Sequence, residues 1–288
     1  MLSGAISMWF ALTALSVVFV AVDIRKTPES PVLKWGFVLL TAYTGPVGAF
    51  LYVLGCREPL PGLHEQYTSA HWRQTLGSTM HCVAGDGLGI LAGAVIGGVV
   101  HMTKPAEIVL EYVLGFGFGW TIFQALFMKG SAGGSFRGAL AKTFVPELVS
   151  MNYLMAAMVV VMTIGMKLVP DSGSPVSMGF WFVMSMALLA GFIAAFPANA
   201  WLVSRHLKHG MMTVRPASSA TRRMVMPAHD SGANEAGAAT HGGAHKARAG
   251  GHPGGVAPVS RPAIAGAIAA SFVALAAGLF VAFIAGEG

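Results

Sequence analysis

The sequence is poor in charged residues and in cysteine. It holds 18 Lys and Arg and 12 Asp and Glu among 288 residues, or 10% charged, whereas an ordinary soluble domain carries about a quarter. So few charges cannot cover so long a chain with a water-soluble surface, which excludes a soluble enzyme and a nucleic-acid-binding module. The two cysteines, Cys56 and Cys82, give no disulfide framework of the kind that holds small secreted domains together.

Motifs of nucleotide and covalent chemistry are also missing. The sequence contains no Walker loop, dinucleotide fingerprint, CxxC pair or nucleophile elbow. ATP-driven transport by this chain alone is therefore not indicated. No residue is predicted to be catalytic, and we expect a protein that is not an enzyme.

Long apolar runs are what the sequence has instead. The residues are 55% hydrophobic and the mean hydropathy is +0.65. A bilayer core needs roughly 20 apolar residues in a helix, and seven stretches qualify: Ser3–Val22, Leu33–Leu54, His81–Val100, Ile108–Met128, Phe144–Met166, Met178–Val203 and Ala263–Ala285. We predict an all-α bundle of seven transmembrane helices in a bacterial inner membrane. No Lys or Arg precedes the first stretch, which favours a retained span over a cleaved signal peptide.

Composition divides the chain into four parts. Residues 1–74 hold two N-terminal helices and a connector, 75–212 a four-helix functional core, and 263–288 the last helix. Residues 213–262 are predicted to be a disordered linker rich in Gly, Ala and His. The connector before the last helix carries histidines that offer weak capture of metal, with compositional drift as the alternative: His206, His209, His229, His241, His245 and His252.

Basic residues predict the orientation of the spans. With seven spans, thirteen Lys and Arg fall in the second, fourth and sixth connectors, and five fall in the other three when Lys34, at the start of the second stretch, is counted with the first connector. This count places the N-terminus and the long linker together on the cytoplasmic side.

The third stretch opens with a set of metal-ligand types. Cys82 and Asp86 are four residues apart and share a helix face, with His81 beside them and Met80 adding a thioether. Thiolate, imidazole and carboxylate ligate transition metals. Two ligands on one helix make only half a site, so other helices must supply the rest.

Sidedness indicates which helices supply them. The third and fifth stretches run in the same direction, so both begin at the same membrane face. Near that face lie His81 of the third stretch and Glu147, Met151 and Asn152 of the fifth. The fourth and sixth stretches end there, with Gln124 and Asn199. We predict a metal site of His81, Cys82, Asp86, Glu147, Met151 and Asn152, with Gln124 orienting the ligands. The alternative is that these polar groups only hold helices together by hydrogen bonds.

Two further periodic patterns lie in the same helices. Gly85, Gly89, Gly93 and Gly97 form a row that permits close helix packing and predicts a central third helix. The methionines of the fifth stretch form one face leading from Glu147 towards Glu107 and Glu111 at the opposite surface: Met151, Met155, Met158, Met162 and Met166. Core filling is one interpretation of this face, and a thioether path for Cu(I) is the other.

The run from Thr79 to Gly89, TMHCVAGDGLG, resembles the His-Cys motif of the membrane family of domain of unknown function 4396. Three later segments resemble it too: Phe123-Gln124 leading to Lys142, Glu147–Met158, and Phe196–Val203 ending at Lys208–Met211. The resemblance covers about Thr75–Met212. It implies a bacterial membrane protein without an established activity, in a family whose members often carry copper-related names. The chain departs from the family where Asp86 stands in place of a second Cys, and where Ile90 stands in place of an acid.

Three functional hypotheses follow. The first is a carrier or handling protein for a transition metal, Cu or Zn. The second is a non-transporting integral subunit or assembly factor of a membrane complex, with purely structural polar groups and with other subunits or copies of the same chain as partners. The third, an intramembrane haem protein, is disfavoured because His81 and His101 lie at opposite ends of one helix. The expected partners are the lipid bilayer and a metal ion, with no nucleic acid.

Overall fold

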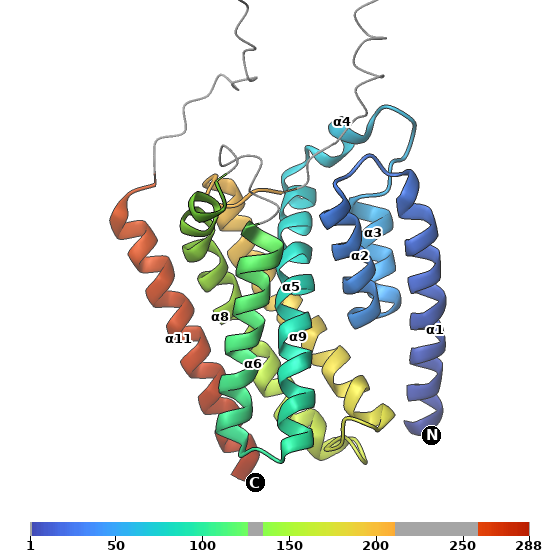
Figure 1. Cartoon of the computed structure of the whole chain (residues 1–288), viewed down its shortest axis with the longest axis vertical. Helices are drawn as coiled ribbons and strands as arrows, with labels where there is room; N and C mark the ends of the chain where they lie inside the picture. The colour runs from blue at the N-terminus through green and yellow to red at the C-terminus, as the bar shows by residue number, and fades with distance from the viewer. Residues whose placement is uncertain (1, 126–134, 211–258, 288) are drawn as a thin grey trace, which may run out of the picture. The chain divides into compact units, whose positions relative to one another are not determined.

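The computed structural model describes residues 2–125, 135–210 and 259–287, and their regular structure is helical throughout. Figure 1 shows the helices side by side. Six apolar helices are long enough to cross a membrane: α1 (Leu2–Asp23), α5 (His71–Val100), α6 (Lys104–Phe118) with its continuation η2 (Gly119–Gln124), α8 (Phe136–Leu168), α9 (Met178–Ser204) and α11 (Arg261–Glu287). The predicted disordered linker, 213–262, lies almost wholly outside the described residues.

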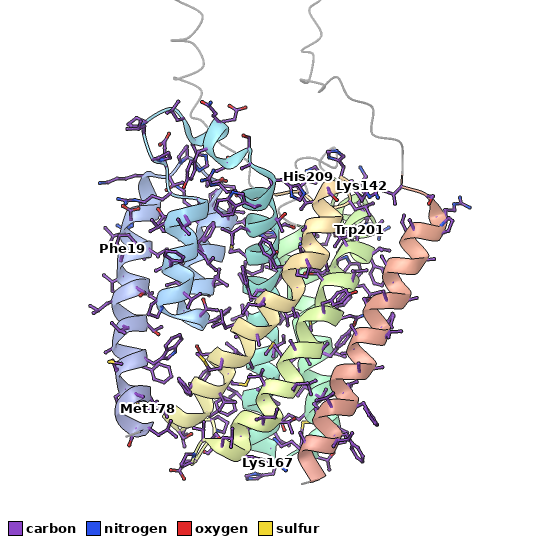
Figure 2. All side chains as sticks on the ribbon, turned by 180° about the vertical axis from the view of Figure 1, so that it is seen from behind. Phe19, Lys142, Lys167, Met178, Trp201 and His209 are labelled. Carbon is purple, nitrogen blue, oxygen red and sulfur yellow. The ribbon has the colours of Figure 1, made fainter. Side chains whose placement is uncertain are left out.

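The outward faces of these helices are apolar. Phe280 and Phe283 of α11 and Leu15 of α1 each expose more than 60% of their surface, and Figure 2 shows carbon-rich side chains projecting from the helices. A water-soluble monomer rarely exposes contiguous apolar surface on this scale. The chain is therefore a multi-pass, membrane-type helical protein.

The predicted second span, Leu33–Leu54, is wrong. It consists of two short helices, α2 (Pro31–Thr44) and α3 (Pro46–Gly55). Gly45 between them has a φ of 59° and a ψ of −137°, and Pro46 begins the next helix. Hydropathy scores the apolar content of the stretch, but proline disfavours the helical conformation of the residue before it and glycine adopts positive φ.

The two short helices form a hairpin, and both of its ends point to the same side in Figure 1. A side chain on Gly48 of α3 would collide with Thr41 of α2, with a Cβ only 2.6 Å from the Thr41 Cα. Since the hairpin returns to the side of the bundle on which it begins, α1 and α5 run in opposite directions. The N-terminal end of α1 therefore lies opposite to the ends of α9 and α11 that flank the linker. The prediction that the N-terminus and the linker share a side is wrong.

Helix α5 lies at the centre, as its glycine row predicted. It packs against α6, α9, α2 and α8. A Cβ on Gly89 would collide with the Leu114 backbone, and one on Gly85 would lie 2.9 Å from Gly119 Cα. Only glycine permits this approach of α5 to α6.

Helix α8 carries the methionine face into the core. Met151, Met155, Met158 and Met162 are buried. On its other side α8 packs against α11, where Gly278 approaches the backbone of Ala156. The methionines therefore fill the space that α8 shares with α5, α6 and α9.

Candidate functional site

Three helices lose their regular geometry at one level of the bundle. Helix α6 continues into a π-helical segment, η2, while α8 contains Pro146 and α9 contains Pro197. π-Segments occur frequently at functional sites, and proline removes a helix hydrogen bond. The site is built where these three irregularities meet the first half of α5.

Cys82, Glu147 and Lys208 form a mutually bonded group at this level. Lys208 Nζ lies 2.6 Å from Cys82 Sγ and 3.2 Å from Glu147 Oε2. The Cys82 thiol donates to the same Glu147 oxygen at 3.1 Å. All three side chains are buried. A carboxylate without a cation would be costly at this depth, and Lys208 supplies that cation.

Lys208 reaches the group from the segment that follows α9. The chain turns at His206, whose φ is 55°, and the backbone N–H groups of Leu207 and Lys208 both donate to Leu202 O. Lys208 Nζ also donates to Asn199 Oδ1 at 3.0 Å. Burial disfavours the ammonium form, yet Cys82 and Glu147 hold the pKa of Lys208 above its usual range.

Lys208 was not predicted to be a site residue. The lysine lies beyond the apolar stretch of α9, where basic residues ordinarily face headgroups and water. Its only signal was its position at the end of the resemblance to the family.

Asp86 faces Glu147 across Gly119. A Cβ on Gly119 would collide with Asp86 Oδ1 and would lie 2.7 Å from Glu147 Oε1. The two carboxyl groups therefore meet at a place that glycine keeps open. Neither oxygen of Asp86 has a hydrogen-bond donor among the described residues.

Two predicted partners lie beside this group. Gln124 of η2 donates to Cys82 Sγ at 3.1 Å, the orienting position predicted for it. His81 is buried, and its Nε2 lies 2.8 Å from Phe123 O. Because a carbonyl only accepts, Nε2 carries the proton in this arrangement, and a metal would bind there only after this hydrogen bond had broken.

Asn152 and Met151 make contacts with other residues. Asn152 accepts a hydrogen bond from the Tyr112 hydroxyl at 2.6 Å and donates to Ser271 Oγ at 3.0 Å, which ties α6, α8 and α11 together. Met151 is buried against Gly115. For Asn152 the hydrogen-bonding alternative describes the geometry better than ligation.

A cavity of about 220 Å³ borders the site. Its polar lining consists of Gln124, Lys142, Thr143, His206, Lys208 and His209, and Figure 2 shows Lys142 and His209 at one end of the bundle, opposite Lys167. Partial burial, with His206 and Lys142 nearby, lowers the pKa of His209. Lys208 and Gln124 both line the cavity and bond Cys82, so they separate the cavity from the buried thiol.

A second acidic group lies further along the α5–α6 contact. Glu107 and Glu111 are buried where Gly97 and Gly93 of α5 leave room for them. Lys104 pairs with Glu107 at 2.7 Å, whereas neither oxygen of Glu111 has a hydrogen-bond partner among the described residues.

The predicted Cys, His and carboxylate ligands do not bring three ligand atoms within 4.8 Å of one another among the residues that the structure describes. Among the residues that the structure describes, one group brings three Cys, His or carboxylate ligand atoms within 4.8 Å of one another, and it consists of Glu29, Cys56 and His64. It lies near α1, α3 and α4 (His64–Thr68), away from Cys82. None of these three residues was predicted to be a site residue.

Comparison with known proteins agrees with the motif in α5. Residues 71–208 match the family described as Domain of unknown function (DUF4396). The match covers 138 of the 288 residues, and we call this matched stretch the DUF4396 domain. The domain begins with α5 and ends at Lys208, so it contains the whole Cys82–Glu147–Lys208 group, and the resemblance seen in the sequence is confirmed. No curated protein and no solved structure matches the chain.

Proposed function

We propose that the chain is a membrane protein that transfers protons, with the DUF4396 domain as its functional core. The observation that carries the proposal is the buried contact of Lys208 with Cys82 and Glu147, beside the facing carboxyl of Asp86. Ionisable side chains in a membrane interior are costly, and they mark ion pathways and proton relays.

Charge balance gives this group an exchangeable proton. Lys208 balances one negative charge, on Glu147, with which it is paired. Asp86 faces the same carboxyl, and no described Lys or Arg forms an ion pair with it. Two carboxylates this close do not both ionise readily, so one proton is held between Asp86 and Glu147. Loss and return of that proton is the elementary step of the proposed transfer.

The route continues along the contact of α5 with α6. Glu111 lies two helical turns from Gly119, about 12 Å along the axis, and Glu107 one turn further. The cavity lined by His206, His209 and Lys208 gives protons access from the other end. Buried acids therefore mark several depths between the two membrane faces.

A transition-metal carrier is the second candidate. The soft Cys82 sulfur and the buried methionine face of α8 favour it. In this arrangement the Lys208 ammonium takes the place beside Cys82 and Glu147 that a metal ion would need. A metal would bind there only after Lys208 had left.

The bundle orientation is part of the same proposal. Ten of the twelve described Lys and Arg residues lie in the connectors and helix ends at the cavity end, and Lys104 and Lys167 lie at the other end. By the excess of Lys and Arg in cytoplasmic loops, the cavity faces the cytoplasm of a cell membrane.

Proton flux into proteoliposomes tests the proposal. Purified protein is reconstituted with a pH-sensitive dye inside, and a potassium gradient with valinomycin sets the membrane potential. We expect the wild type to acidify the lumen and Glu147→Gln to fall to the rate of protein-free liposomes. Glu65→Gln, at an exposed acid of α4, is the matched control and should conduct like the wild type.

The same vesicles separate the two candidates. With a zinc-sensitive or copper-sensitive dye inside, metal influx without proton flux would overturn proton transfer in favour of the carrier. Equal proton rates in wild type, Glu147→Gln and empty liposomes would also overturn it.

A further inference from the structure

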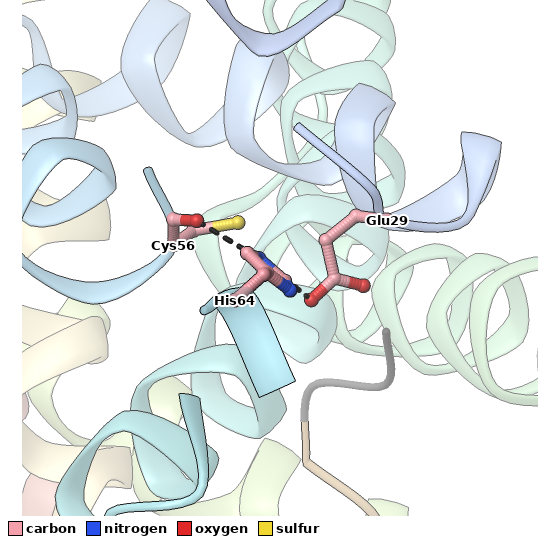
Figure 3. A group of neighbouring side chains, drawn as sticks. All are labelled: Glu29, Cys56 and His64. Atoms are coloured by element: carbon pink, nitrogen blue, oxygen red, sulfur yellow. Dashed lines mark hydrogen bonds and ion pairs between the residues drawn. The ribbon is translucent and has the colours of Figure 1, made fainter. Parts of the chain in front are cut away.

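Glu29, Cys56 and His64 meet in a buried pocket outside the DUF4396 domain. Glu29 lies between α1 and α2, Cys56 ends α3, and His64 begins α4. Figure 3 shows the three side chains converging from separate segments. Their ligand atoms all lie within 4.8 Å of one another, and each side chain is at least 95% buried.

The surrounding contacts hold the three segments in place. Tyr52 of α3 bonds Thr27, at 3.1 Å, and Asp23, at 2.9 Å, which fixes the segment that carries Glu29. On the other side, Tyr67 of α4 donates to Leu54 O at 2.7 Å, and Arg73 donates to the same carbonyl at 3.1 Å. The segment that carries Cys56 is therefore bonded to both of its neighbours.

The spacing suits a small metal ion after a modest contraction. His64 Nε2 lies 3.6 Å from Glu29 Oε1, and a metal bound at Nε2 would replace the proton that this atom shares with the Cys56 carbonyl oxygen, 3.0 Å away. Zinc binds Cys sulfur at about 2.3 Å and His nitrogen at about 2.0 Å in tetrahedral geometry, which places ligand atoms about 3.5 Å apart. The three side chains need to move by no more than about 1 Å towards a common centre.

The ligand chemistry selects the metal. One thiolate, one imidazole and one carboxylate are the types that zinc takes. Ca²⁺ and Mg²⁺ prefer sites of oxygen alone, and the hard carboxylate makes the set poor for Cu(I).

We propose that Glu29, Cys56 and His64 bind one zinc ion, with the fourth position open to water. The ion ties the loop after α1 to the ends of α3 and α4, and so fixes the hairpin of α2 and α3 against α5. This site does not depend on the proton-transfer proposal, because it lies before residue 71, where the DUF4396 domain begins.

Cobalt titration of the full-length protein in detergent tests the site. Co²⁺ replaces zinc, and its bond to a thiolate gives a charge-transfer absorption in the near ultraviolet. Because the chain has two cysteines, the band identifies its ligand by substitution. We expect one equivalent of Co²⁺, with the band lost in Cys56→Ser and kept in the matched control Cys82→Ser.

The remaining outcomes overturn the proposal. A band lost in Cys82→Ser and kept in Cys56→Ser would move the metal to the core of the bundle. Absence of a band in the wild type would remove the site. If Cys56→Ser fails to fold, Glu29→Gln replaces it, with zinc affinity read by competition against a chelating dye. Loss of this ligand should weaken binding more than about tenfold, and unchanged affinity would contradict the site.

Discussion

Lys208 Nζ lies 2.6 Å from Cys82 Sγ, although 126 residues separate the two along the chain. The contact brings the end of the DUF4396 domain back to its first helix. It also places a positive charge beside Glu147, at 3.2 Å from Oε2. The lysine therefore determines the charge of the whole group.

Removal of this lysine should destabilise the protein. Lys208→Met leaves Glu147 buried without its cation, and breaking a buried pair in this way costs about 3–5 kcal/mol. Thermal unfolding in detergent should show a lower midpoint than the wild type.

The double variant Lys208→Met/Glu147→Gln distinguishes the ion pair from simple packing. It removes both charges, so it should recover most of the lost stability. If the double variant is less stable than Lys208→Met, the two side chains do not act as a pair.

The glycine row gives a second prediction. Gly89→Ala places a methyl group against the Leu114 backbone, and such overpacking typically costs about 1–3 kcal/mol. Gly117→Ala is the matched control in α6, because nothing lies within 4 Å of its added Cβ. The melting temperature should fall for the first variant only; equal melting would mean that α5 and α6 do not touch there.

Helix packing and part of the site followed from the sequence. The four-residue spacing from Gly85 to Gly97 predicted the face of α5 that meets α6, because helical periodicity depends only on local sequence. The sharing of one membrane level by Cys82, Asp86 and Glu147 followed from the parallel directions of α5 and α8. These predictions needed only the relative direction of two spans.

Other features depend on tertiary structure. Hydropathy does not detect that Gly45 and Pro46 turn an apolar stretch into a hairpin, and the error reversed the predicted side of the N-terminus. Lys208 and the group of Glu29, Cys56 and His64 lie in connectors, where no periodicity shows which side chains meet. Asn152 shares the level of the site but points to Tyr112 and Ser271, because level alone does not fix the direction of a side chain.

The hairpin leads to a topology prediction. Reporter fusions after Glu287 and in the turn at Met102 should both give the non-cytoplasmic signal, whereas a fusion at Ala233 in the linker should give the cytoplasmic one. If the hairpin of α2 and α3 begins and ends on the cytoplasmic side, a reporter fused to the N-terminus should also give the non-cytoplasmic signal. A cytoplasmic signal at the N-terminus, with the others as expected, would mean that α2 and α3 cross the membrane.

Zinc should stabilise the protein in a pH-dependent manner. Burial, with Glu29 nearby and against the opposing effect of Lys34, raises the pKa of Cys56 well above its usual value. The free thiol therefore keeps its proton at neutral pH, and zinc must displace that proton. If zinc binding releases one proton, the apparent affinity for zinc should rise about tenfold for each unit of pH near neutrality.

Chelation provides the corresponding stability measurement. At free zinc 100 times the dissociation constant, a ligand that binds only the folded state adds about 2.7 kcal/mol. EDTA should therefore lower the melting temperature of the wild type, and it should leave Cys56→Ser unchanged. An equal effect of EDTA on both proteins would contradict binding at Cys56.

Proton flux through Glu111→Gln tests the central claim most directly. Glu111 is buried in the α5–α6 contact, about two helical turns from the level of Asp86, and no described residue bonds its oxygens. Because Glu111 acts as a relay in the proposed route, Glu111→Gln should reduce proton flux to the rate of protein-free liposomes. The melting temperature of this variant should not be lowered, and the control Glu65→Gln should conduct protons like the wild type. If Glu111→Gln conducts protons at the rate of the wild type, no proton route runs along these buried acids.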